Sequence, residues 1–125
     1  MSFQSIEEVR ARCEKENVPF WKAVQSEDAQ ERDVPAEDSW KEMKHMWQAM
    51  IDGVDAYEPG LVSRSGLVGK EGGLMEEYAR TGEPLCGRYM AKVMTTALKM
   101  GCNNACMKRI VAAPTAGACG VLPAV

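Results

Sequence analysis

The sequence has few aromatic residues, a single histidine and no long apolar run. These shortages limit the composition of the core, the catalytic and metal sites that are possible, and the chance of a membrane-spanning helix. Aromatic residues make up only 6% of the 125 residues, so a core has to be built mainly from Leu, Val, Met and Ala. No stretch approaches the roughly 20 apolar residues that cross a bilayer, and the charged start from Met1 to Arg10 does not have the pattern of a secretory signal. The net charge of −3 argues against a nucleic acid partner, because neutralising phosphates requires clustered Lys and Arg.

The scarcity of histidine also limits the chemistry. His45 is the only histidine and lies between Lys44 and Met46, where we expect a partly exposed helix residue rather than a base or a ligand. A His-rich metal site is therefore excluded, no Ser-His-Asp set can be completed without this residue, and neither GxGxxG nor a P-loop pattern appears. The five cysteines are an odd number without an export signal, so we interpret them as reduced thiols of a cytoplasmic protein.

Apolar residues recur at helical spacing along most of the chain, and strand alternation is almost absent. We therefore expect an all-α protein with two glycine-rich loops. The first expected helix runs from a capping box at Ser5 to about Asn17, and a second, short helix begins at Phe20 and is followed by a polar, acidic segment (26–38). Three further helices are expected over about 36–54, over about 74–80, and over 86–100 with Gly101 as the C-terminal cap. Residues 103–111 are either a further helix or an extended entry to the final loop.

Two segments combine glycine with apolar anchors. In the first, residues 61–73, Ser63-Arg64-Ser65-Gly66 can offer hydroxyls and backbone N–H groups to a small anion such as a carboxylate, although an ordinary hydroxyl-capped turn is the alternative. In the second, residues 112–125, glycine lets the backbone approach a ligand closely. Chains usually end in polar, loosely held residues, so this apolar ending predicts that the polypeptide is a piece of something larger.

Three cysteines near the second segment are candidate metal ligands. Cys102 and Cys106 are four residues apart, which places them on one side of a helix, and Cys119 follows at a distance that a loop can close. Three thiolates can hold an iron–sulfur cluster or a zinc ion with one position open. The favoured alternative is that they are small buried residues, because a CxxxC spacing is not that of a dedicated cluster motif. Asn103 and Asn104 also have two alternative roles, since each can cap a helix or orient a ligand.

Three blocks of sequence then narrow the function. They are Gly60-Leu61-Val62-Ser63-Arg64-Ser65-Gly66-Leu67, Asn104-Ala105-Cys106-Met107, and Ala113-Pro114-Thr115-Ala116-Gly117-Ala118-Cys119-Gly120-Val121-Leu122-Pro123. Together they resemble the start of the catalytic α chain of bacterial iron–sulfur-dependent L-serine dehydratase, and the third block is specific to that family. The resemblance implies a variable helical lead-in over residues 1–58 and the start of a larger α-helical catalytic domain over residues 59–125.

The resemblance also implies an activity for the full-length protein. That activity is an L-serine ammonia-lyase reaction, which converts L-serine to pyruvate and ammonia and belongs to amino acid metabolism and gluconeogenesis. A [4Fe–4S] cluster would act as the Lewis acid, and a β chain or β domain would complete a cytoplasmic homo- or hetero-oligomer. The family's cluster-cysteine motifs and its Ser-His-Thr-Gly-Pro motif are absent from these 125 residues. The chain by itself is therefore expected to be inactive and to hold no cluster.

The same resemblance assigns candidate site residues. Cys106 and Cys119 are only weak metal candidates, because relatives often have alanine at these positions. A rival reading is a stand-alone helical interaction module that docks a partner through the Met and Trp face of the long helix. The expected substrate-binding residues are Ser63, Ser65, Gly66, Asn104, Pro114, Thr115, Ala116 and Gly117.

Overall fold

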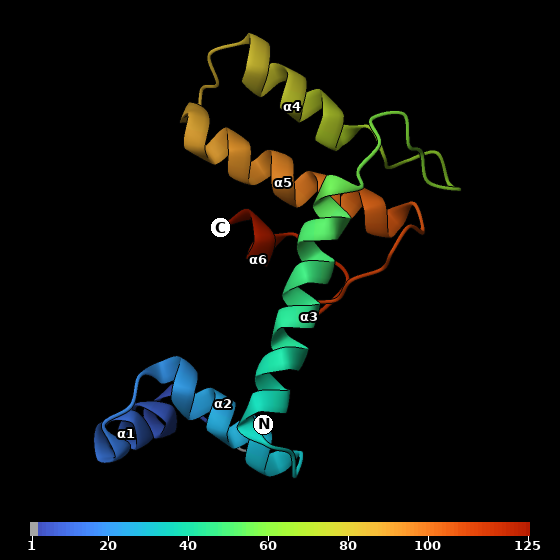
Figure 1. Cartoon of the computed structure of the whole chain (residues 1–125). Coiled ribbons are helices and arrows are strands. Elements are labelled where there is room, and N and C mark those ends of the chain that lie inside the picture. The colour runs from blue at the N-terminus through green and yellow to red at the C-terminus, as the bar shows by residue number, and fades with distance from the viewer. Residues whose placement is uncertain (1–2) are drawn as a thin grey trace. The chain divides into compact units, whose positions relative to one another are not determined.

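A computed structural model describes residues 3–125 and contains helices but no strand within that range, which confirms the expected all-α class (Figure 1). None of the described helices is both long enough and apolar enough to cross a membrane. The chain divides into two compact units, one up to Met46 and one from Trp47 onward. The helices are α1 (Ile6–Glu16), α2 (Phe20–Glu31), α3 (Ala36–Asp55), α4 (Glu71–Thr81), α5 (Gly87–Ala105) and α6 (Val121–Ala124).

In the first unit, α1 begins and ends where its local sequence predicts. The Ser5 hydroxyl accepts a hydrogen bond from the backbone N–H of Glu8 at 3.2 Å, and the Glu8 carboxylate accepts one from the N–H of Gln4 at 2.8 Å. These bonds satisfy N–H groups that have no partner within the helix. The helix ends at Asn17, whose left-handed φ of 51° is tolerated by asparagine. Ser5 is therefore confirmed as the N-cap, whereas the Glu8 carboxylate binds the N–H of Gln4 rather than that of Ser5.

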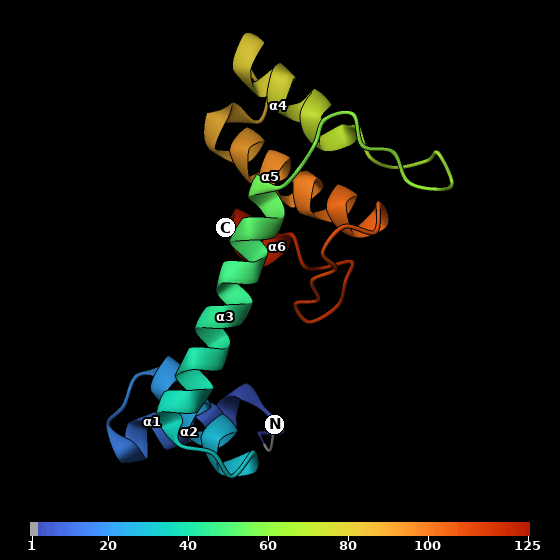
Figure 2. The ribbon, with the colours of Figure 1, turned by 45° about the vertical axis from the view of Figure 1, so that its right-hand side comes forward.

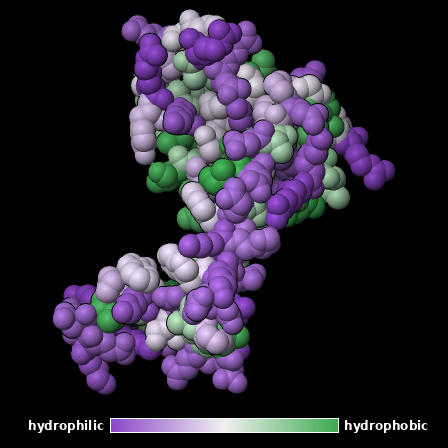
Figure 3. Space-filling view, in the orientation of Figure 1, coloured by the Kyte–Doolittle hydropathy of each residue, from purple (hydrophilic) through white to green (hydrophobic). Residues whose placement is uncertain are grey.

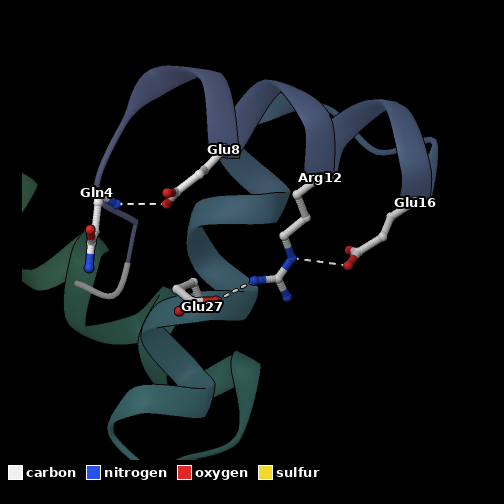
Figure 4. Close-up of polar contacts among 5 residues, drawn as sticks. All are labelled: Gln4, Glu8, Arg12, Glu16 and Glu27. Carbon is white, nitrogen blue, oxygen red and sulfur yellow. Dashed lines mark hydrogen bonds and ion pairs between the residues drawn. The ribbon is translucent and has the colours of Figure 1, made fainter.

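Polar contacts join the helices of this unit to one another (Figure 4). The Arg12 guanidinium of α1 forms an ion pair with Glu27 of α2, and its Nε lies 3.0 Å from a carboxylate oxygen of Glu16. The Ser39 hydroxyl of α3 donates to the Asp28 carboxylate of α2 at 2.6 Å. The helix expected as a short stretch from Phe20 therefore extends into the polar, acidic segment as far as Glu31, where Glu27 and Asp28 contact neighbouring helices.

In the second unit, α4 and α5 lie side by side and α6 packs against α5 (Figures 1 and 2). Met50 of α3 and Met100 of α5 are almost completely buried, and they pack in one cluster with Val111 and Cys119. The space-filling view shows hydrophobic side chains emerging between α3 and α5, with hydrophilic side chains over α4 (Figure 3). The apolar core of this unit therefore lies between α3, α5 and the chain that follows α5.

Two helix boundaries differ from the sequence-based prediction. The helix expected from residue 74 begins at Glu71, and α5 continues through Gly101 to Ala105, so the prediction that Gly101 caps this helix is wrong. The reason is tertiary: Asn103 is buried and its side-chain amide donates to the backbone oxygen of Gly53 in α3. Residues 103–105 thus complete α5 rather than starting another element. The short helix α6 was not predicted.

Candidate functional site at the C-terminal end of α5

The last turn of α5 holds two loops that are far apart in the sequence. We call residues 61–70 the first loop and residues 107–120 the second loop, and Cys106, which lies between α5 and the second loop, is the C-cap of that helix. The Cys106 thiol lies 3.8 Å from the backbone oxygen of Val68 in the first loop. The side chain of Asn104, two residues earlier, bonds to the second loop. In Figures 1 and 2 the first loop, which connects α3 to α4, lies toward the end of α5 from which the second loop leaves. The segments that the sequence singled out are therefore brought to one place.

The first loop is closed by its own serines. The N–H of Ser63 donates to the oxygen of Val68 at 2.7 Å, and the N–H of Val68 donates to the Ser63 hydroxyl at 3.2 Å. The N–H of Gly66 donates to the oxygen of Ser63 at 2.9 Å, and Gly66 has a φ of 74°. The hydroxyl oxygens of Ser63 and Ser65 are 3.0 Å apart. One hydroxyl hydrogen is used between them, which leaves the other available to a ligand.

Tyr57 and Glu71 fix the base of the first loop, and sequence reasoning missed both. The Tyr57 hydroxyl donates to the oxygen of Gly69 at 2.7 Å and accepts from the N–H of Gly73 at 2.9 Å. The Glu71 carboxylate accepts from the N–H of Gly69 at 2.7 Å and from the Cys102 thiol at 3.4 Å. Burial raises the pKa of Tyr57, so its hydroxyl stays protonated and can donate. Both polar groups of Gly69 are therefore held by side chains.

Gly69 also explains why this position needs glycine. Its φ is 149°, a conformation that residues with a side chain rarely adopt, and a Cβ atom here would lie 2.0 Å from the oxygen of Leu61. The two ends of the first loop consequently meet backbone to backbone at Gly69.

The pH dependence of the first loop follows from Glu71. The Gly69 N–H lowers the pKa of this carboxyl, with help from the N–H of Glu71 itself and from the Cys102 thiol. A carboxyl whose pKa is lower in the folded state stabilises the fold above its ordinary pKa and loses that effect as the pH falls through the lowered value. We expect the exchange protection of the Gly69 amide, measured by NMR, to be constant above the ordinary glutamate pKa of about 4.3 and to fall as the pH drops below it. In Glu71→Gln the protection should be lower and independent of pH.

The control for this prediction is Glu77→Gln, which removes an exposed carboxylate from the same helix. The control should keep the wild-type pH profile at Gly69. Identical profiles for the wild type and Glu71→Gln would contradict the assignment.

Asn104 organises the second loop. Its side-chain nitrogen lies 2.8 Å from the oxygen of Val111, 3.0 Å from the oxygen of Ala116 and 2.9 Å from the sulfur of Cys119. Its side-chain oxygen accepts from the N–H of Val111 at 3.0 Å. The amide offers two hydrogens to these three acceptors. Its donors are therefore directed within the second loop, and the structure gives Asn104 a positioning role.

The other expected residues of the second loop, residues 114–117, form its exposed tip. The bond between Ala113 and Pro114 is cis. The backbone oxygen and the hydroxyl of Thr115 each accept from the N–H of Ala118 at 3.2 Å, which closes the turn. Below the tip, Gly120 approaches α5 so closely that a Cβ atom would lie 2.5 Å from the oxygen of Ala97. The tip is thus open to a ligand, whereas its base is packed on α5.

The three candidate thiols have different partners. Cys102 faces Glu71, Cys106 faces Val68, and Cys119 faces Ala116 and Asn104. Burial raises the pKa of Cys102 and of Cys119, which favours the protonated thiols. Among residues 3–125, no three His, Cys, Asp or Glu side chains converge as a metal site would require. The geometry of these thiols does not fit three ligands of one cluster.

A small all-α unit with two glycine-bearing loops at one helix end, one carrying Ser63 and Ser65 and the other Thr115, agrees with the family that the sequence suggested. Residues 15–125 match the family described as "Serine dehydratase alpha chain", and the chain belongs to this family. The match includes most of the segment that we expected to be a variable lead-in.

Two curated proteins illustrate the relationship. The chain is 26% identical over 121 residues to the "Probable L-serine dehydratase, alpha chain" of Bacillus subtilis (strain 168), which covers 97% of this chain and 40% of that protein. It is 48% identical over 48 residues to the "L-serine dehydratase, alpha chain" of Peptoniphilus asaccharolyticus, which covers 38% of this chain and 16% of that protein. The chain thus spans less than half the length of these relatives. No solved structure matches it.

Proposed function

We propose that this chain supplies part of the substrate pocket of an L-serine dehydratase, a lyase that converts L-serine to pyruvate and ammonia. The observation that supports the proposal is the attachment of both loops to residues 102–106, which are the last turn of α5 and its C-cap Cys106. The family membership and the names of the two relatives support the same reaction. As part of such an enzyme, the chain would work with a β chain or β domain in an oligomer, in the cytoplasm.

The reaction removes the α-proton and the β-hydroxyl group of serine. The aminoacrylate that results tautomerises and is hydrolysed to pyruvate and ammonia. In our proposal the paired hydroxyls of Ser63 and Ser65 bind the substrate carboxylate, with the exposed Arg64 guanidinium adding a positive charge beside them. Gly66 keeps the turn open at this point, and the tip of the second loop, residues 114–117, borders the same substrate. Asn104 holds that tip in place.

Departure of the hydroxyl group is the difficult step, because hydroxide is a poor leaving group. A [4Fe–4S] cluster would supply a Lewis acid for it when bound. Since Cys102, Cys106 and Cys119 face different partners, we place the ligands of such a cluster outside residues 3–125. This chain alone would then show no dehydratase activity.

The experiment uses the whole open reading frame that contains this sequence, purified without oxygen and loaded with iron and sulfide. We expect it to form pyruvate from L-serine. Ser63→Ala and Ser65→Ala should each raise KM by roughly tenfold, because a hydrogen bond to a charged group contributes about 1.5–3 kcal/mol. The control, Ser26→Ala, removes an exposed hydroxyl from α2 and should leave KM unchanged.

Two results would count against the proposal. A folded, cluster-loaded protein that forms no pyruvate would overturn the activity. Unchanged KM values in both serine variants would remove the first loop from the pocket.

A further inference from the structure

The groove between α4 and α5 carries an excess of positive charge that the proposed activity does not use. It has a volume of about 500 Å³ and lies on the second unit, along the helices rather than at the loops at the end of α5. Strongly hydrophilic side chains cover this part of the molecule in Figure 3. The groove is lined by Val54, Glu76, Ala79, Arg80, Arg88, Lys92, Thr95, Thr96 and Lys99.

Only one of its four cations is neutralised locally. Lys99 forms an ion pair with Glu76, the single carboxylate of the lining. In the part of the chain that the structure describes, Arg80, Arg88 and Lys92 have no carboxylate within ion-pairing distance. The groove therefore carries a net charge of about +3, counted from its ionised side chains at neutral pH.

The arrangement of these groups suits a polypeptide. Arg88 and Lys92 are one helical turn apart on α5, so their charges follow the length of the groove. Val54 and Ala79 contribute apolar surface between the charged groups. A groove with apolar surface and charged edges accepts a segment that has apolar residues and the opposite charge.

The chain itself contains a segment that is negatively charged and lies beside apolar side chains. Residues 26–38 hold six carboxylates and one arginine. Asp33, Glu37 and Asp38 are exposed. Lys41 lies 3.1 Å from Glu37 and 3.4 Å from Asp38, so the segment together with Lys41 keeps an excess of negative charge. The neighbouring indole rings of Trp21 and Trp40 are about half exposed. The first unit thus presents acidic and apolar groups together.

We propose that the α4–α5 groove binds the acidic segment 26–38 of a second copy of this chain. Two copies can make this contact reciprocally, each offering one segment and one groove, which is the closed arrangement of a twofold dimer. The guanidinium groups of Arg80 and Arg88 are suited to carboxylates because they donate in pairs. The contact concerns assembly and is independent of the proposed dehydratase activity.

The first test measures the mass of the chain in solution by analytical ultracentrifugation. We expect dimers that weaken at least tenfold between about 20 mM and about 500 mM salt, since exposed charges are screened by ions. Arg88→Glu with Lys92→Glu should weaken the dimer at least tenfold at low salt. The matched control, Lys70→Glu with Arg109→Glu, makes the same charge change outside the groove and should leave the dimer intact.

The second test exchanges the charges between the two sides. Glu37→Lys with Asp38→Lys should also weaken the dimer when that variant is alone. A mixture of this variant with Arg88→Glu/Lys92→Glu should form mixed dimers, because each acidic segment then meets a basic groove and each basic segment an acidic groove. The groove variant should keep the helical circular dichroism of the wild type.

The proposal is overturned if the chain has the mass of a single copy at low salt. This is also the result expected if the segment met the groove of its own chain or if the groove served another acidic protein. It is equally overturned by a dimer that Arg88→Glu/Lys92→Glu leaves unchanged, or by a mixture that forms no mixed dimer.

Discussion

Asn104→Ala should lower the free energy of unfolding of the second unit by about 2–3 kcal/mol, since each buried polar group left unpaired costs about 1–3 kcal/mol. The substitution deprives the oxygen of buried Val111 of its donor and the N–H of Val111 of its acceptor, whereas the oxygen of exposed Ala116 can bind water instead. Urea unfolding followed by circular dichroism measures the change. Faster exchange of the Val111 amide would show that the second loop is the part released.

Two variants make this prediction specific. Asn104→Asp keeps an acceptor for the N–H of Val111 but cannot donate to the two backbone oxygens, so we expect it to be at least as destabilising as alanine. Gln48→Ala removes an amide that bonds only Asp52 on the exposed side of α3, and it should change stability by less than about 0.5 kcal/mol. Wild-type stability in Asn104→Ala would show that Asn104 does not hold the loop.

Gly120→Ala should lower the free energy of unfolding by about 3 kcal/mol, the upper end of the usual cost of overpacking. The new Cβ would lie 2.5 Å from the oxygen and 2.9 Å from the Cα of Ala97. These are backbone atoms of α5, so they cannot move aside as the end of a side chain can. The φ of −76° at Gly120 is acceptable for alanine, so the expected loss is steric. Thermal and urea unfolding measure it.

Gly101→Ala is the matched control for this prediction. No atom lies within 4 Å of the position that its Cβ would take, and the residue is inside α5. Alanine should therefore raise the free energy of unfolding by about 1 kcal/mol through its higher helix propensity. Destabilisation by Gly101→Ala would mean that α5 ends at this glycine, contrary to the structure. Equal effects of both substitutions would contradict the close approach at Gly120.

Local sequence signals predicted most of the helices. Ser5 and Glu8 mark the start of α1 and Asn17 its end, because capping depends on residues that are neighbours in the chain. The long helix expected over about 36–54 is observed as α3. The prediction failed at the end of α5, where the bond from Asn103 to Gly53 joins residues that are 50 positions apart. No local pattern contains that information.

In the candidate site too, features marked by neighbouring residues were predicted, and features that depend on residues far apart in the sequence were missed. Clustered glycine and serine indicated the first loop, glycine and proline indicated the second, and the structure brings both to the end of α5. Tyr57 and Glu71 were missed because their partners lie elsewhere in the chain: Tyr57 bonds Gly73, 16 positions away, and Glu71 bonds Cys102, 31 positions away. Whether Ser63, Ser65 and the tip of the second loop contact a substrate stays a prediction.

The last turn of α5 and its C-cap, residues 102–106, anchor both loops. A shift of residues 102–106 would displace both loops, because Asn104 anchors the second loop and Cys106 lies against Val68 of the first loop. Under the proposed function, we expect variation that tunes substrate choice to accumulate at the outer bends, around Arg64 and Thr115, while residues 102–106 stay unchanged. Libraries that aim at new substrates would be best confined to those outer positions.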